Sequence, residues 1–323
     1  MRAGLKLAIY GDFGNFTLRR LAGQPSNYLK QDAELFAKWK VDGLKFDGCY
    51  AKIEDMAAGY VAMGRHLNAT GRRVQYSCSW PAYDPHANFT VLARHCNLWR
   101  VYADIADSWR SVLGVFDYYR NASAHIQPVA APGAWNDPDM LIVGDFGLSY
   151  EQSRAQMAMW AVLAAPLYMS NDLRNIRPEF REILLNRKVL AVNQDVLGMQ
   201  GKPVGQVQLP ARKALHLERP RVEVWSRPIS PPGSQAVVIL NRDDNGGPVK
   251  LSIALKQLGL LDSGGYEVEE IFTNRYYGFM SPDDTFSCRV NPTGVIMITA
   301  IAQHHEKQAR VLRARPPVRL TQI

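Results

Sequence analysis

The chain has 323 residues, is 47% hydrophobic and carries a formal net charge of +8, so it can bury the core of one large domain with a smaller one, or of two medium ones. Half of the excess charge falls in residues 304–323, where five basic side chains face one glutamate, which favours a disordered, solvated tail over a nucleic-acid-binding face. No apolar run reaches the length of a membrane span, and the first residues enter a strand-like segment without a signal-peptide cleavage region.

The cysteines and histidines predict no metal centre and no cofactor. Cys49, Cys78, Cys96 and Cys288 lack a metal-ligand spacing, and no His-Glu-x-x-His pattern occurs. Four N-glycosylation sequons near polar or turn-like boundaries suggest the secretory route, although no signal peptide is evident. The four acceptors are Asn15, Asn68, Asn88 and Asn121.

The first 200 residues alternate short apolar segments with amphipathic helices, which predicts βαβ units and a parallel sheet. Six strands are expected, beginning near residues 5, 41, 73, 98, 126 and 165. Ser108 is expected to cap a helix, and Ser149 with Gln152 forms a capping box at the start of another. Residues 176–190 are expected to form one helix. No glycine-rich nucleotide loop follows any expected strand, which disfavours a Rossmann fold.

The stretch 41–50 organises this region, because an apolar strand ends there in a lone carboxylate, Asp47. Active sites of α/β folds lie just past the carboxyl ends of such strands. The alternative is that Asp47-Gly48 is only a turn dipeptide. Polar residues follow the other expected strands too, as at a barrel's catalytic face; they are Tyr10 and Asp12, Ser79, Asp104, Asp139 and Asp172.

From about residue 200 the pattern changes to short apolar strands between Pro/Gly turns, which predicts an antiparallel β-sandwich. The expected strands are residues 222–225, 236–240, 249–253, 266–271 and 295–298. We therefore expect an α/β catalytic domain over residues 1–202, a sandwich over residues 203–303, and a basic tail over residues 304–323.

Two strand-end carboxylates among aromatic residues suit glycoside hydrolysis, in which one carboxylate attacks and a carboxylic acid protonates the leaving oxygen. Asp47 and Asp104 are the candidates, and aromatic rings such as Tyr10, Trp80 and Tyr83 would hold the sugar. The alternatives are a plain loop carboxylate for Asp104 and core packing for the tryptophans, more so for Trp99 than for Trp80.

Five ordered motifs resemble those of the animal lysosomal α-galactosidase and α-N-acetylgalactosaminidase family, glycoside hydrolase family 27. They are Leu44-Lys-Phe-Asp-Gly-Cys49, Tyr76-Ser-Cys-Ser-Trp-Pro-Ala-Tyr83, Asn97-Leu-Trp-Arg-Val-Tyr-Ala-Asp-Ile105, Trp135-Asn-Asp-Pro-Asp-Met-Leu141 and Ala164-Ala-Pro-Leu-Tyr-Met-Ser-Asn-Asp172. The resemblance implies a (β/α)8 TIM barrel followed by an antiparallel β-sandwich. It covers most of residues 5–200 and, more weakly, the sandwich.

By that resemblance Asp47 is the nucleophile and Asp104 the acid/base of a retaining mechanism, about 5 Å apart. Lys45 would help to keep Asp47 ionised, whereas burial and nearby carboxylates would raise the pKa of Asp104. The substrate-binding residues implied are Tyr10, Lys45, Ser79, Trp80, Ala82, Tyr83, Arg100, Asp139 and Met140.

Two departures from the family pattern stand out. The family has two further strand–helix units before the first strand here, so the chain is expected to form a barrel lacking its first two units. The family cysteine that pairs with Cys49 falls at Leu18, so Cys78 and Cys96 are expected to be bridged while Cys49 and Cys288 stay free.

The small residues Ser79 and Ala82 replace a Glu and a Leu of the galactose-specific branch and leave space for a 2-acetamido group. The resemblance thus implies an exo-glycosidase that releases terminal α-linked N-acetylgalactosamine, and more weakly α-galactose, from glycolipids and glycoproteins. The alternatives are loop packing for the two small residues and, for the chain, an inactive glycan-binding or decoy form. A homodimer in the lysosome or outside the cell is implied, with no nucleic-acid partner.

Overall fold

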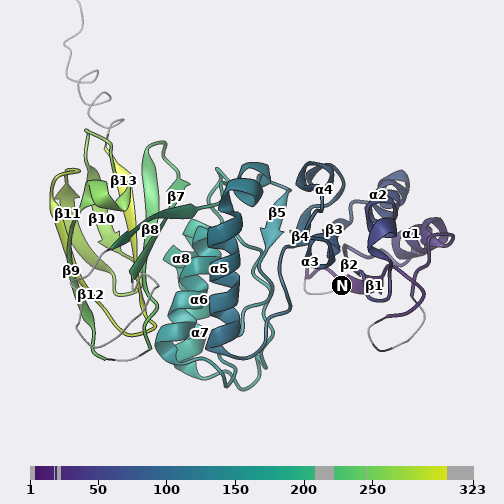
Figure 1. The fold of residues 1–323 in the computed structure, drawn as a ribbon, viewed down its shortest axis with the longest axis horizontal. Helices are drawn as coiled ribbons and strands as arrows, with labels where there is room; N and C mark the ends of the chain where they lie inside the picture. Colours follow the sequence, from purple (N-terminus) through teal and green to yellow (C-terminus); the bar gives the residue numbers. More distant parts are fainter. Residues whose placement is uncertain (1–3, 18, 20–22, 208–221, 245, 304–323) are drawn as a thin grey trace, which may run out of the picture. The chain divides into compact units, whose positions relative to one another are not determined.

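The computed structural model describes residues 4–17, 19, 23–207, 222–244 and 246–303. The expected tail and Leu18 lie outside the described residues. The chain divides into two compact units. The first comprises residues 1–148, 164–175 and 198–200, and the second comprises residues 149–163, 176–197 and 201–323. Figure 1 labels most elements of both units, which are described separately below.

The first unit is built on a five-stranded sheet in the order β1-β2-β3-β4-β5, with every neighbouring pair parallel. Helices connect the strands, as the alternating pattern predicted. The strands are β1 (Ala8–Asp12), β2 (Gly43–Asp47), β3 (Gln75–Cys78), β4 (Leu98–Arg100) and β5 (Trp135–Asp137). The helices are α1 (Leu29–Lys38), α2 (Ile53–Ala69), α3 (Trp80–Tyr83), α4 (Phe89–His95), α5 (Trp109–Ile126) and the 3-10 turn η1 (Gln127–Val129).

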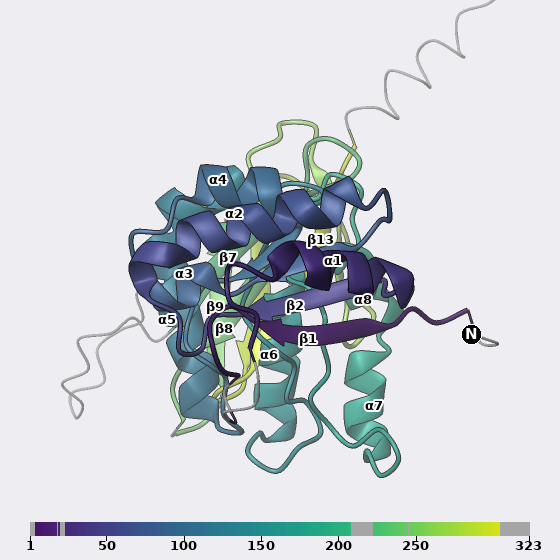
Figure 2. The ribbon, with the colours of Figure 1, turned by 90° about the vertical axis from the view of Figure 1, so that its right-hand side faces the viewer.

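One face of this sheet is covered by helices. Figure 2 shows α1 and α2 side by side over β1 and β2. Because successive residues of a strand point to opposite faces, Leu44 and Phe46 share one face, and the Phe46 ring lies 5.4 Å from the Tyr60 ring of α2. Lys45 and Asp47 therefore belong to the other face.

Two expected strands of this unit are wrong. Residues 126–130 end α5 and form η1, because the apolar side chain of Ile126 is buried from the last helical turn. The strand lies instead at β5, inside the expected loop. Its Asn136 is buried and bonded to Trp99 Nε1 at 2.8 Å, so polar residues form this strand. Residues 165–170 contribute only an isolated parallel bridge between Leu141 and Met169.

The second unit contains three helices and the antiparallel sheets. Ser149 and Gln152 form the expected capping box of α6. The single helix expected over residues 176–190 is wrong: Asn186 accepts hydrogen bonds from the backbone N–H groups of Lys188 and Val189 and so begins a second helix. The helices are α6 (Tyr150–Val162), α7 (Pro178–Leu184) and α8 (Arg187–Asn193).

The sandwich pairs a six-stranded sheet, in the order β11-β10-β13-β8-β7-β6, with a two-stranded sheet of β12 and β9. Its buried apolar core includes Val224, Ile239 and Phe286. The five expected strands are confirmed, and three were missed. The strands are β6 (Lys202–Val207), β7 (Val222–Ile229), β8 (Ser234–Asn241), β9 (Val249–Ala254), β10 (Tyr266–Glu270), β11 (Arg275–Met280), β12 (Thr285–Val290) and β13 (Val295–Ala302); a 3-10 turn, η2 (Leu255–Leu258), follows β9.

The compact units do not follow the expected division at residue 203, because α6, α7 and α8 belong to the unit that holds the sandwich. The boundaries 1–202 and 203–303 therefore stay a prediction. Among the helices that the structure describes, none combines the length and the apolar character needed to cross a membrane.

Candidate active site

The carboxyl edge of the parallel sheet gathers charged side chains. Asp12 pairs with Asp47 in the register of β1 and β2, and Arg100 pairs with Asp137 in the register of β4 and β5. Registered residues of parallel strands project from the same face, so each pair lies on one face at the last paired position. The sequence prediction that strand ends converge on a site is met for these strands.

Asp47 is held as a carboxylate by several donors. Its Oδ1 accepts hydrogen bonds from Tyr83 Oη at 2.7 Å and from the Gly48 N–H at 2.9 Å, and its Oδ2 lies 2.9 Å from Tyr10 Oη. Burial alone would raise the pKa of Asp47, but these bonds and the nearby charge of Lys45 lower it overall. An ionised carboxylate that faces an open cavity is suited to act as a nucleophile.

The two tyrosines beside Asp47 are hydrogen-bond donors. Burial, together with contacts to carboxylates, raises the pKa of Tyr10 well above its usual value. Burial also raises the pKa of Tyr83, as do its contacts with Cys49 and Asp47. Both phenols therefore keep their protons at neutral pH and can stabilise the charge on Asp47.

A buried arginine links the two other acidic residues of the site. Arg100 Nη2 lies 3.0 Å from Asp104 Oδ1 and 2.8 Å from Asp139 Oδ2. Asp139 has a left-handed φ of 82°, and its carboxylate accepts from the backbone N–H groups of Ile105 and Met140. The expected burial of Asp104 is wrong: its side chain is 90% exposed because it extends from the loop after β4 toward solvent.

A cavity of about 690 Å³ opens at this edge. Its size suits a monosaccharide with part of an attached group. Seven predicted site residues line it: Tyr10, Lys45, Asp47, Arg100, Asp104, Asp139 and Met140. Four further lining residues were not predicted: Thr17, Arg19, Ile105 and Ser170.

The predicted residues of the segment 79–83 divide into two groups. Tyr83 reaches Asp47, as described above, and Ala82 is exposed. Trp80 is 4% exposed and donates its indole N–H to Asp84 at 2.9 Å, so it packs in the core of the unit. Ser79 is buried, and its hydroxyl has no hydrogen-bond partner among the described residues. None of these four is among the described residues that line the large cavity.

Asp137 is a charged group that sequence reasoning missed. It is buried, and with Arg100 and Tyr168 it lines a smaller cavity of about 210 Å³. Burial raises its pKa to about 6, although Arg100 and the backbone N–H of Asp139 oppose the rise. The sequence signal that could have identified Asp137 is its place two residues before Asp139, within the motif of residues 135–141. Asp172, noted as a strand-end residue, is instead exposed and pairs with Arg174.

The cysteine prediction is confirmed by the structure. Cys78 and Cys96 form a disulfide, and Cys49 and Cys288 are free. The four sequon asparagines, at positions 15, 68, 88 and 121, are all exposed. Asn121 lies within α5 and not at a turn-like boundary, so that part of the expectation is wrong.

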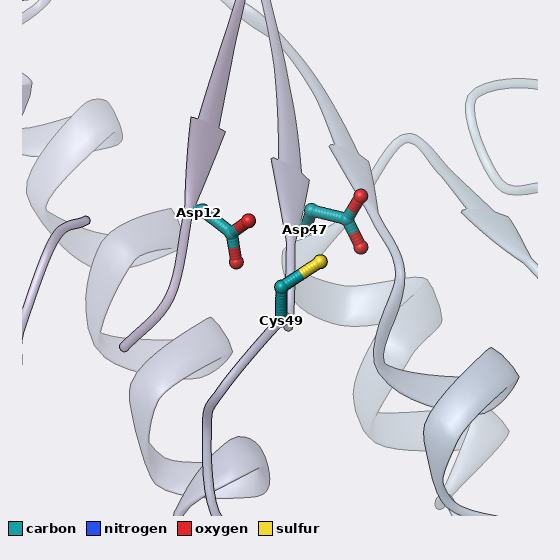
Figure 3. Close-up of side chains that lie close together, drawn as sticks. All are labelled: Asp12, Asp47 and Cys49. Atoms are coloured by element: carbon teal, nitrogen blue, oxygen red, sulfur yellow. The ribbon is translucent and has the colours of Figure 1, made fainter. Parts of the chain in front are cut away.

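Asp12, Asp47 and Cys49 bring three ligand-type atoms within 4.8 Å of one another (Figure 3). Asp12 ends β1, whereas Asp47 and Cys49 come from the end of β2. Cation binding here would compete with the three donors that already bond Asp47. The arrangement therefore fits a hydrogen-bonded nucleophile better than a metal centre.

A parallel α/β sheet whose carboxyl edge holds several carboxylates around an open cavity suits glycoside hydrolysis. The family profile described as Alpha galactosidase A matches residues 1–195, and the profile of its C-terminal beta sandwich domain matches residues 212–294. The chain belongs to this family of glycoside hydrolases.

Individual relatives agree with this assignment. The α-N-acetylgalactosaminidase of Gallus gallus is 45% identical over 298 residues, which cover 91% of this chain and 70% of the relative. The α-galactosidase A of Homo sapiens is 42% identical over 304 residues, which cover 91% of this chain and 67% of that protein. The crystal structure of α-galactosidase I from Mortierella vinacea matches with a TM-score of 0.79 and 26% identity, over 93% of this chain and 77% of that one.

Proposed function

We propose that the chain is a retaining exo-glycosidase that hydrolyses terminal α-linked N-acetylgalactosamine, and more weakly α-galactose, in glycolipids and glycoproteins. The observation that carries the proposal is the hydrogen-bonded, ionised Asp47 on the same cavity as Asp104. The names of the relatives at 45% and 42% identity supply the two sugars.

In the first step the Asp47 carboxylate attacks the anomeric carbon while the Asp104 carboxylic acid protonates the glycosidic oxygen. The bond to the leaving group breaks, and a covalent glycosyl ester forms on Asp47. In the second step Asp104, now a carboxylate, takes a proton from water, and the resulting hydroxide displaces Asp47 from the sugar. Each step transfers one proton, so the enzyme returns to its starting state.

The remaining cavity residues would bind the sugar. Arg100 holds Asp104 and Asp139 in place, and Lys45 Nζ lies 5.8 Å from the Tyr10 ring centroid, close enough to add positive charge near the nucleophile. The choice of sugar rests on the relative at 45% identity, because Ser79 and Ala82 are small but neither is among the described residues that line the cavity. Lysosomal or extracellular location and a homodimer complete the proposal.

A non-catalytic glycan-binding protein is the second candidate. It is favoured by the exposure of Asp104 and by its ion pair with Arg100, since a general acid must carry a proton before it can act. Such a protein would bind the sugar through the same cavity and release it unchanged.

The test compares Asp47→Asn and Asp104→Asn on an activated aryl α-N-acetylgalactosaminide and on a natural glycan. Losing the nucleophile should lower kcat by about 10⁴-fold or more on both substrates. Losing the acid should spare formation of the glycosyl enzyme from the activated substrate, because its leaving group needs no proton. A parent protein that binds the sugar without turnover would establish the second candidate, and equal losses on both substrates for both variants would contradict the assigned roles.

A further inference from the structure

Tyr10 connects two carboxyl groups through one oxygen. Its Oη lies 2.8 Å from Asp12 Oδ2 and 2.9 Å from Asp47 Oδ2, and both distances are those of hydrogen bonds. A phenol has a single hydrogen, so it can donate to only one of them. The other contact needs its own proton, because two lone pairs at that distance repel.

The missing proton belongs on Asp12 or on Asp47, and the surroundings of the two carboxyls differ. Asp47 accepts from Tyr83 and from the Gly48 N–H and has Lys45 nearby, all of which favour its charged form. Asp12 is only 1% exposed, and its Oδ1 has no hydrogen-bond partner within the described part of the chain. An isolated buried carboxylate oxygen is costly, whereas a protonated carboxyl group tolerates burial.

The other groups around Asp12 do not reverse this preference. Burial raises the pKa of Asp12 first of all, and the charge on Asp47 raises it further. Hydrogen bonds from Tyr10, from the Cys49 thiol and from the Cys49 backbone N–H lower it without cancelling the rise. The Cys49 thiol is a weak donor, and burial raises its own pKa, so it brings no charge to the pair. Two close carboxyls with opposed surroundings commonly share a single proton in this manner.

We propose that Asp12 is a positioning residue that carries a proton in the working enzyme and donates it to Tyr10 Oη, which fixes the Tyr10 hydrogen toward Asp47 Oδ2. The chain Asp12–Tyr10–Asp47 thereby holds the nucleophilic oxygen in place. Asp12 itself touches no substrate. This inference rests on the proposed role of Asp47 as the nucleophile.

The kinetic test uses the full chain with an activated aryl α-N-acetylgalactosaminide. Asp12→Ala removes the donor to Tyr10 and should lower kcat about 10- to 100-fold, the loss expected for a hydrogen bond to a charged group, with little change in KM. Asp12→Asn keeps a neutral donor of the same shape and should recover most of that loss. In a Tyr10→Phe background, changing Asp12 should have no further effect, because the connecting hydroxyl is gone.

Asp32→Asn on α1 is the matched control, since it makes the same chemical change at a residue that is not among those lining the cavity and should leave kcat unchanged. If kcat falls as far in Asp12→Asn as in Asp12→Ala, Asp12 acts as a carboxylate and the proposal is overturned. Thermal unfolding measures the fraction of each variant that is folded. The value of kcat is then expressed per folded molecule, so that a loss of folding is not mistaken for a loss of rate.

Infrared difference spectra supply a readout that does not depend on turnover. The spectra are recorded in an Asp104→Asn background, which removes the proton that the general acid carries. Above the pKa of Asp137, which is about 6, this protein should show the carbonyl stretch of a protonated carboxyl group. That band should disappear in Asp12→Asn and persist in Asp47→Asn. A band that disappears only in Asp47→Asn would overturn the proposal. If Asp47→Asn stays fully active, the proposed function fails, but the spectra still decide which carboxyl holds the proton.

Discussion

The sandwich and the carboxyl edge of the parallel sheet both bury acidic side chains, but they treat them differently. In the sandwich Glu223 is 2% exposed and bonds Arg242 at 2.9 Å and the Trp225 indole N–H at 3.2 Å. At the sheet edge Asp137 is buried with a raised pKa, near an Arg100 already shared by two other carboxylates. The sandwich therefore neutralises its charge locally, whereas the edge keeps charge available to a ligand at a cost in stability.

The largest stability effect that would test this difference is expected in the sandwich. Glu223→Gln removes the buried carboxylate that bonds Arg242 and the Trp225 indole and should lower the free energy of unfolding by about 3–5 kcal/mol. Urea denaturation measures the change. The control is Asp283→Asn, which breaks an exposed pair with Lys256 at 2.7 Å and should cost under about 1 kcal/mol. Equal effects of the two variants would show that local pairing does not stabilise the sandwich.

Removing the disulfide should have the next largest effect on the free energy of unfolding, in the unit that holds the sheet edge. Cys78 and Cys96 close a loop with a sequence separation of 18, for which the chain-entropy estimate is about 3 kcal/mol. Replacing both with alanine should therefore lower the unfolding free energy by that order. Peptide mapping of the unreduced protein checks the pairing. Recovery of a peptide that joins Cys49 to Cys288 would contradict it.

Asp137→Asn should change stability in the opposite direction. Its folded pKa, about 6, exceeds the ordinary 3.8, so the folded state binds the proton more tightly than the unfolded state does. The penalty is absent below the ordinary pKa and grows as the pH rises toward 6. The amide keeps an oxygen for the Asp139 N–H, bonded at 2.8 Å, and should add up to about 3 kcal/mol above pH 6.

Unfolding free energies measured across this pH range check the sign. The gain should vanish below about pH 3, where Asp137 is protonated in both the folded and unfolded states. A variant that is less stable than the parent at neutral pH would show that Asp137 serves the edge as a paired carboxylate, as Glu223 serves the sandwich.

The fold could be predicted where apolar periodicity governs the element. β2 ends at Asp47 as the apolar run indicated, and the five expected sandwich strands follow apolar runs. β5 was missed because it is three residues long and carries Asn136 and Asp137, whose burial is stabilised by partners distant in sequence. Pattern analysis reads a polar strand as a loop, since a single sequence does not show such partners.

The candidate site, too, could be predicted only in part from the sequence. Strand-end position identified Asp47, Asp104 and Tyr10, and the cavity brings them together. The exposure of Asp104 and the burial of Trp80 depend on how the loops after β4 and β3 fold back, which spacing does not specify. The bridging position of Tyr10 between two carboxyls depends on the register of β1 against β2.

The last prediction concerns which sugar the edge accepts, and its expected effect is the smallest. Ser79→Glu/Ala82→Leu places larger side chains at the two positions proposed to leave room for a 2-acetamido group, and it introduces a carboxylate at a buried position. The ratio of kcat/KM for aryl α-N-acetylgalactosaminide to that for aryl α-galactoside should fall below one. A shape mismatch of this kind is worth about 1–3 kcal/mol, or roughly 10- to 200-fold.

The single variants separate the two contributions. Ser79→Ala removes only the hydroxyl, which lacks a partner among the described residues, and should lower the N-acetylgalactosaminide rate while sparing the galactoside. Ala82→Leu should also lower the rate on the N-acetylgalactosaminide, because its larger side chain takes up more space. If the parent prefers the galactoside, or if the double variant leaves the ratio unchanged, the small residues serve the packing of the loop after β3, and specificity comes from elsewhere on the carboxyl edge.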